Sequence, residues 1–111
     1  MRILAPAVLA TLLATTPPVA GAEPVMLELT IKDHRFEPAE LKVPAGQPFI
    51  IRITNLDPTA EEFDSSSLKV EKVVAGHGEG IVRKNHGLDA GRYEFIGEYH
   101  EDTAKGVLIA E

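Results

Sequence analysis

The sequence predicts an all-β domain, an antiparallel sandwich or barrel of about seven or eight short strands. Three observations predict it. Apolar residues recur at every second position over short runs, which is the period of a half-buried strand. Turn-forming residues separate these runs at spacings of about 8 to 12 residues. No stretch has the 3.6-residue period of a long helix.

The first 22 residues differ in kind from the rest. After Arg2 they carry no charge, and positions 20–22 hold the small residues Ala-Gly-Ala. This pattern is typical of a secretory signal peptide cleaved before Glu23. Prolines interrupt the apolar run, which is too short for a convincing membrane span, although a retained anchor is the alternative. We therefore expect an exported, periplasmic protein with one domain, residues 23–111.

Composition limits the partners of this domain. Residues 23–111 hold all 17 acidic residues and 10 of the 11 basic ones, so their formal charge is 10 minus 17, or −7. A negative field disfavours nucleic acid and favours metal ions or a basic protein surface. Cysteine is absent, so the chain has neither a disulfide nor a thiolate ligand.

Alternation defines the elements of the first half. Apolar residues at positions 25, 27, 29 and 31 predict a strand over 25–33. Phe36, Leu41 and Val43 form a second apolar series, which ends at a turn over 44–46. Residues 49–53 alternate again, and the turn-forming sequence Asn-Leu-Asp-Pro at 55–58 ends that strand.

The middle of the chain is ambiguous. Over 61–75, Phe63 is an isolated apolar residue in an acidic patch, and the apolar phase changes around Glu71. Both a short strand pair and one helical turn fit this pattern. A glycine-rich turn at 76–80 and a strand over 81–88 follow.

The last stretch, residues 93–111, predicts two strands joined by a polar loop. The loop offers one imidazole and several carboxylates: Glu98, His100, Glu101 and Asp102. Mixed nitrogen and oxygen donors on a loop between two strands are suited to a divalent metal such as Cu(II), Fe or Zn.

Four segments, in order, resemble conserved patterns of the cupredoxins. They are FEPAELKVPAG (36–46), FIIRITNLDP (49–58), LDAGRYEF (88–95) and GEYHEDTAKGVL (97–108). Together they extend over essentially the whole of residues 23–111 and imply a Greek-key β-sandwich. The segment AEEFDSSSLKVEKVV (60–74) and the last loop resemble the EfeO-type group, which is found in bacterial iron-uptake systems.

The chain departs from the blue-copper proteins of that family. Their last loop supplies a thiolate, an imidazole and a weak thioether, and here these positions fall at Gly97, at His100 and near Thr103. The position of their other histidine holds Glu61 and Glu62. Only one blue-copper ligand therefore remains, and we expect no trigonal blue-copper site.

The expected metal site instead combines His100 with carboxylates. Glu62 or Glu61 would come from one loop, and Glu98 and Glu71 would complete the shell. Strand parity places Glu61 inward if Phe63 is buried, whereas the family pattern favours Glu62. The alternative for each of these carboxylates is a solvated surface residue. Asp64 and Glu101 are further candidates, and His34 and Met26 are better interpreted as edge-strand surface.

The resemblance implies a role in redox-linked uptake of ferrous iron. We expect a metal-binding accessory protein that takes up copper, with Cu(II) favoured by the general affinity order and iron as the other candidate. Its partners would be a periplasmic iron-binding protein or a membrane iron permease. The alternatives are a copper-dependent oxidase of ferrous iron and a metal-free interaction module.

Overall fold

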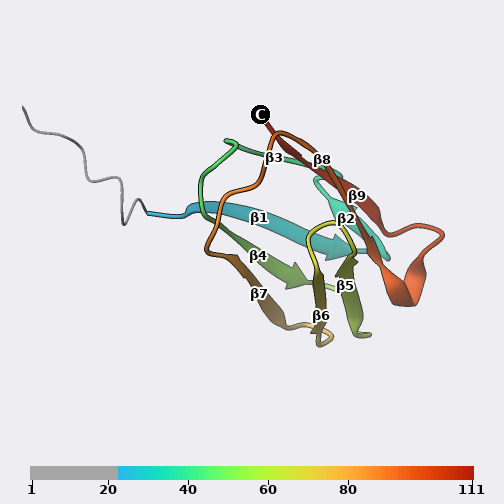
Figure 1. Cartoon of the computed structure of the whole chain (residues 1–111). Helices are drawn as coiled ribbons and strands as arrows, with labels where there is room; N and C mark the ends of the chain where they lie inside the picture. Colours follow the sequence, from blue (N-terminus) through green and yellow to red (C-terminus); the bar gives the residue numbers. More distant parts are fainter. Residues whose placement is uncertain (1–22) are drawn as a thin grey trace, which may run out of the picture.

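The computed structural model describes residues 23–111, so the predicted signal peptide lies outside the described residues. These residues form nine strands and one short 3-10 helix, arranged as two packed sheets (Figure 1). The elements are β1 (Val25–Lys32), β2 (Arg35–Glu37), β3 (Glu40–Val43), β4 (Phe49–Asn55), β5 (Glu61–Ser65), β6 (Val70–Val74), β7 (Glu79–Lys84), β8 (Gly91–Gly97), η1 (Glu98–His100) and β9 (Lys105–Ala110). Within this part of the chain, no helix has the length and apolarity needed to cross a membrane.

The predicted sandwich is confirmed, but its sheets are mixed rather than purely antiparallel. One sheet has the order β2-β1-β4-β7 and the other the order β3-β9-β8-β5-β6. Strand β1 pairs in parallel with β4, and β3 with β9. Parallel neighbours require a crossover connection, and here the chain makes it by passing through the other sheet. The strand count exceeds the expected number because residues 35–43 divide at Pro38 into β2 and β3, one in each sheet.

The ambiguous segment 61–75 folds as the hairpin β5-β6. Ser65 stabilises its turn, because the hydroxyl accepts a hydrogen bond from the Leu68 N–H and donates one to the Glu94 carbonyl. In β5 the side chains of Glu61, Phe63 and Ser65 are buried, and those between them are half-buried. The period of two therefore decides which carboxylates face the interior.

Three phenylalanines join the two sheets. The ring centroid of Phe36, on β2, lies 5.1 Å from that of Phe95 and 6.0 Å from that of Phe63, in edge-to-face contacts. Phe63 and Phe95 come from the opposite sheet, and their centroids are 4.9 Å apart. Aromatic contacts of this kind stabilise a core beyond the area they bury. The trio packs beneath the end of the sandwich where the polar loops gather.

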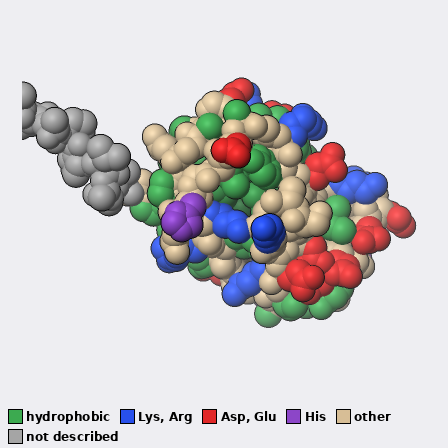
Figure 2. Space-filling model, viewed as in Figure 1, with side chains coloured by type: hydrophobic (Ala, Val, Ile, Leu, Met, Phe, Trp, Pro, Cys, Tyr) green, Lys and Arg blue, Asp and Glu red, His purple; other side chains and the backbone are tan. Residues whose placement is uncertain are grey.

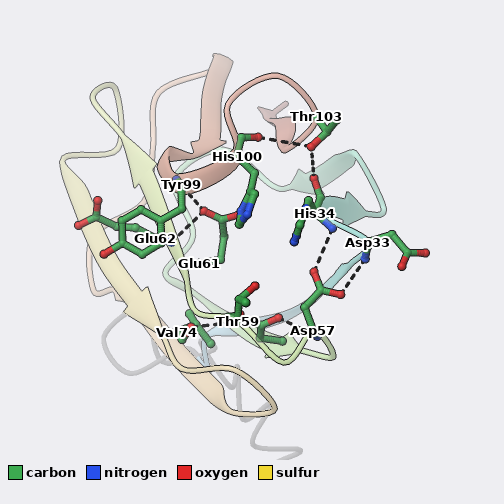
Figure 3. Close-up of polar contacts among 11 residues, drawn as sticks. Asp33, His34, Asp57, Thr59, Glu61, Glu62, Val74, Tyr99, His100 and Thr103 are labelled. Atoms are coloured by element: carbon green, nitrogen blue, oxygen red, sulfur yellow. Dashed lines mark hydrogen bonds and ion pairs between the residues drawn. The ribbon is translucent and has the colours of Figure 1, made fainter.

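Parallel pairing of β1 with β4 brings those loops together. Because both strands point the same way, Ile31 lies opposite Asn55 at their ends. The β1-β2 turn and the β4-β5 loop therefore emerge side by side, and η1 reaches them from the other sheet (Figure 3).

Candidate metal centre

Glu61 is a buried carboxylate at the start of β5, with only 1 % of its surface exposed. One oxygen, Oε1, accepts hydrogen bonds from the backbone N–H groups of Tyr99 (2.9 Å) and Glu62 (3.0 Å). The other, Oε2, lies 2.5 Å from Nδ1 of His100. A carboxylate this deeply buried requires such partners. They fix its orientation and tie β5 to η1.

The same contact orients His100, whose side chain is 26 % exposed. In the tautomer with a proton on Nδ1, the imidazole donates this hydrogen bond to Oε2 of Glu61. Glu61 and His100 thus form a preorganised pair with one oxygen and one nitrogen donor.

His34 lies directly against this pair. Its ring stacks on that of His100, with centroids 3.5 Å apart and planes inclined by 13°. It stands in the two-residue β1-β2 turn rather than on an edge strand, where the sequence pattern placed it. Figure 3 shows both imidazoles, Glu61 and Asp57 arranged around one opening.

Asp57, on the β4-β5 loop, supports the turn that carries His34. Its carboxylate accepts the backbone N–H groups of Asp33 (2.8 Å) and His34 (2.9 Å). The hydrogen bond from the His34 N–H, together with that from Asp33 and the charges of His34 and His100, lowers the pKa of Asp57. Opposite Asp57, the hydroxyl of Thr103 donates to the His34 carbonyl oxygen over 2.6 Å.

A second group of carboxylates lies on the outer side of β5. Oxygen atoms of Glu62, Asp64 and Glu98 lie within 4.8 Å of one another. Glu71 stands opposite Asp64 in the β5-β6 ladder, and it lines the same groove as Asp64 and Glu98. Acidic side chains are crowded over this part of the molecule in Figure 2.

The outer carboxylates carry more negative charge than their surroundings neutralise. Burial, followed by the neighbouring Glu98, raises the pKa of Asp64 to about 7. Hydrogen bonding with Glu98 raises the pKa of Glu62, whereas that of Glu98 is lowered because it is bonded to Asp64 and Glu62. Oδ1 of Asp64 is buried without a hydrogen-bond partner in the described part of the chain. The raised pKa values favour protonation of Glu62 and Asp64, which a bound cation would oppose.

The five carboxylate and imidazole candidates thus divide between two faces of β5. Glu61 lies beside His100, as strand parity predicts, whereas Glu62, which the family pattern favoured, faces outward. Glu98 belongs with Glu62, and Glu71 lies next to them. Sequence reasoning did not place His34 beside His100. The signal that could have found it is the two-residue turn Asp33-His34 between a clear strand and Phe36.

Comparison with solved structures shows the same fold in copper proteins. Auracyanin A, a "blue" copper protein of Chloroflexus aurantiacus, is 19 % identical, with a TM-score of 0.67 over 80 % of this chain and 100 % of that one. The metal-binding domain of the Cu(I)-exporting P-type ATPase of Streptococcus pneumoniae D39 is 18 % identical, with a TM-score of 0.64 over 78 % of this chain and 84 % of that one. At these identities the likeness shows the fold alone.

A closer relative in sequence is an uncharacterised protein of Rickettsia prowazekii (strain Madrid E). It is 42 % identical over 83 residues, which cover 75 % of this chain and 66 % of that protein. This chain therefore spans about two thirds of the length of that relative.

The residues present do not fit a blue-copper centre. A Cβ atom at Gly97, the position of the family's thiolate, would lie 2.6 Å from Cβ of Ala104 and 2.7 Å from Cδ of Glu61. The carboxylate of Glu61 thus fills the space that a cysteine side chain would enter. The residues do fit a metal bound through carboxylate and imidazole, because those two donors already meet at Glu61 and His100. A family model described as a cupredoxin-like domain matches residues 3–110, and the chain belongs to this cupredoxin-like family.

Proposed function

We propose that this protein binds Cu(II) between His100 and Glu61 and serves as a metal-binding accessory protein. The observation that carries the proposal is the contact of 2.5 Å between Oε2 of Glu61 and Nδ1 of His100, in a carboxylate that is 1 % exposed. An ion that displaces the shared proton meets one oxygen and one nitrogen donor already held in place. Little side-chain freedom is then lost on binding.

Copper suits this pair better than other common divalent ions. Imidazole and carboxylate ligands bind first-row metals in an order that peaks at Cu²⁺. Bound copper would supply one-electron chemistry, though without the thiolate that defines the blue centres. The fold relatives support copper as well, since they include a "blue" copper protein and a domain of a Cu(I)-exporting ATPase.

We further propose that the protein works in the periplasm, in the uptake of ferrous iron. The leader-like residues 1–22 and the EfeO-type sequence pattern of 60–74 support this setting. Its partner would be a periplasmic iron-binding protein or a membrane iron permease. The net negative charge supports collection of cations from solution.

The outer carboxylates favour a second candidate function, oxidation of ferrous iron. Glu62, Asp64 and Glu98 offer only oxygen atoms, which suit hard cations, and Oδ1 of Asp64 lacks a partner. In this reading the outer group would hold the substrate iron, and copper held by His100 and Glu61 would accept one electron, so that Fe(II) becomes Fe(III) as Cu(II) becomes Cu(I). Stopped-flow measurement of Fe(II) loss separates the candidates, because only an oxidase consumes Fe(II) faster when copper is loaded.

Isothermal titration with Cu(II) tests the proposed function. We expect His100→Ala and Glu61→Gln each to weaken binding about tenfold or more, equivalent to about 1.4 kcal/mol. His86→Ala is the matched control, because His86 is an exposed histidine of the β7-β8 loop. Equal affinities in wild type and His100→Ala would refute the site, and a titration with no heat beyond that of surface-carboxylate binding would support a metal-free interaction module.

A further inference from the structure

We infer that His34 is a third metal-binding side chain of this centre and that Asp57 and Thr103 are the residues that position it. The inference rests on the proposed function and extends it. It converts a pair of donors into a set of two imidazoles and one carboxylate. That combination of two nitrogens and one oxygen favours Cu(II) over Mg²⁺ or Ca²⁺, which prefer oxygen alone.

The backbone of the β1-β2 turn is the first argument. Asp33 and His34 both have positive φ angles, 52° and 58°. A two-residue hairpin turn with both residues in this region is normally formed by Asn-Gly or Gly-Gly, because a Cβ atom is strained there. Such a strained residue is kept only where the surroundings hold it. A turn that only reversed the chain would not need a histidine at its second position.

The surroundings hold this residue from both sides. The carboxylate of Asp57 binds the His34 N–H, and the Thr103 hydroxyl binds its carbonyl oxygen. Asp57 is itself anchored, since its own N–H donates to Oδ1 of the buried Asn55. The Thr103 hydroxyl also lies 3.5 Å from the His100 carbonyl oxygen, so one side chain joins the two histidine segments. The backbone of His34 is therefore fixed relative to that of His100.

The position of the ring is the second argument. The centroids are 3.5 Å apart and the ring planes are nearly parallel, so the two imidazoles lie close enough for a single ion to reach both once one ring turns. His34 is exposed, and rotation of its side chain is what brings both lone pairs onto one ion.

The decisive variant is His34→Gly, measured in the full chain with Cu(II) alone. Glycine removes the imidazole and relieves the strained φ, so the fold is kept or stabilised while the ligand is lost. We expect about a tenfold loss of Cu(II) affinity and the loss of one nitrogen coupling from the Cu(II) electron paramagnetic resonance spectrum. His86→Ala, at an exposed loop histidine, should change neither.

Substitutions at the two positioning residues, Asp57 and Thr103, should change Cu(II) binding in a different way. Asp57→Asn and Thr103→Val keep every ligand, so the nitrogen couplings should remain while Cu(II) affinity falls about threefold or more. Unchanged affinity in both variants would overturn their assigned role. Wild-type affinity and couplings in His34→Gly would overturn the inference alone, provided that His100→Ala still weakens binding. If His100→Ala also binds as wild type does, the proposed function fails with it.

Discussion

Glu61 is a carboxylate at a position of β5 where the neighbouring inward residue is Phe63. It is tolerated there because three N–H groups converge on it, two from the backbone and one from His100. Removing the acceptor leaves those donors without partners in a site from which water is largely excluded. The fold and the metal site therefore depend on the same side chain.

This dependence predicts unequal effects of two substitutions at Glu61. Glu61→Leu leaves the donors unpaired and should lower the free energy of unfolding by about 2–4 kcal/mol. Glu61→Gln keeps an amide oxygen for the backbone N–H groups and should cost less than half as much. Urea denaturation measures both, with Glu62→Gln on the outer face as control. Equal stability of the leucine variant and the wild type would contradict the buried hydrogen-bond network.

The raised pKa of Asp64 predicts that its contribution to stability changes with pH in the opposite sense to that of most carboxylates. Its pKa is about 7 in the folded protein and 3.8 as a free side chain, so the fold binds the proton more tightly than the unfolded chain does. Its contribution is complete below pH of about 4 and is lost as pH rises through about 7. Asp64→Asn should thus stabilise the metal-free protein by about 1–2 kcal/mol at pH of about 8 and change little at about 3.5.

Urea denaturation at both pH values tests this, with the exposed Asp89→Asn as control. A stability difference that is the same at both pH values would show that the outer carboxylates do not share protons as described.

At the scale of the element, β5 and the turn that follows β8 place two donor sets on opposite sides of one sheet. Alternation along β5 sends Glu61 inward and Glu62 and Asp64 outward. In the short helix η1, His100 likewise lies on the inner side with Glu61, and Glu98 lies on the outer side with Glu62 and Asp64. The imidazole–carboxylate pair and the outer carboxylates therefore lie on opposite sides of the same strand.

Gly97, at the end of β8, shows how tightly that end is packed. A methyl group there would enter the space of Ala104 and Glu61, at 2.6 and 2.7 Å. Gly97→Ala should therefore destabilise the fold by about 1–3 kcal/mol and weaken Cu(II) binding by displacing Glu61. Thermal unfolding and Cu(II) titration of the variant measure the two effects. Wild-type values for both would mean that the Glu61 side chain has room to move aside.

Strand positions were largely predictable from the sequence, because alternation in 25–31 and 49–53 depends only on neighbouring residues. Strand parity likewise predicted that Glu61 faces inward. The proximity of His34 to His100 was not predictable, since it depends on a parallel pairing of β1 with β4 that joins residues far apart in sequence. The separation of Glu62 and Glu98 from His100 was not predictable either, because it depends on how η1 lies against β5.

At the scale of the whole molecule, the parallel pairing gathers the donors at one end of a small sandwich. His34 and Asp57 follow β1 and β4 of one sheet, whereas Glu61 begins β5 and His100 follows β8 in the other sheet. A metal bound by His34 together with Glu61 and His100 would link both sheets. Since the unfolded chain cannot assemble these donors, binding free energy adds to the stability of the entire domain.

Cu(II) should therefore raise the midpoint of thermal unfolding. At a free concentration of about 100 times Kd, a ligand specific for the folded state adds about 2.7 kcal/mol. For a domain of this size each kcal/mol corresponds to about 4–8 °C, so we expect a shift of about 10–20 °C. The shift should fall to about half or less in His100→Ala, whose affinity is about tenfold lower or more, and persist in His86→Ala, as followed by circular dichroism. Equal shifts in both variants would instead locate the bound copper on surface carboxylates, away from Glu61 and His100.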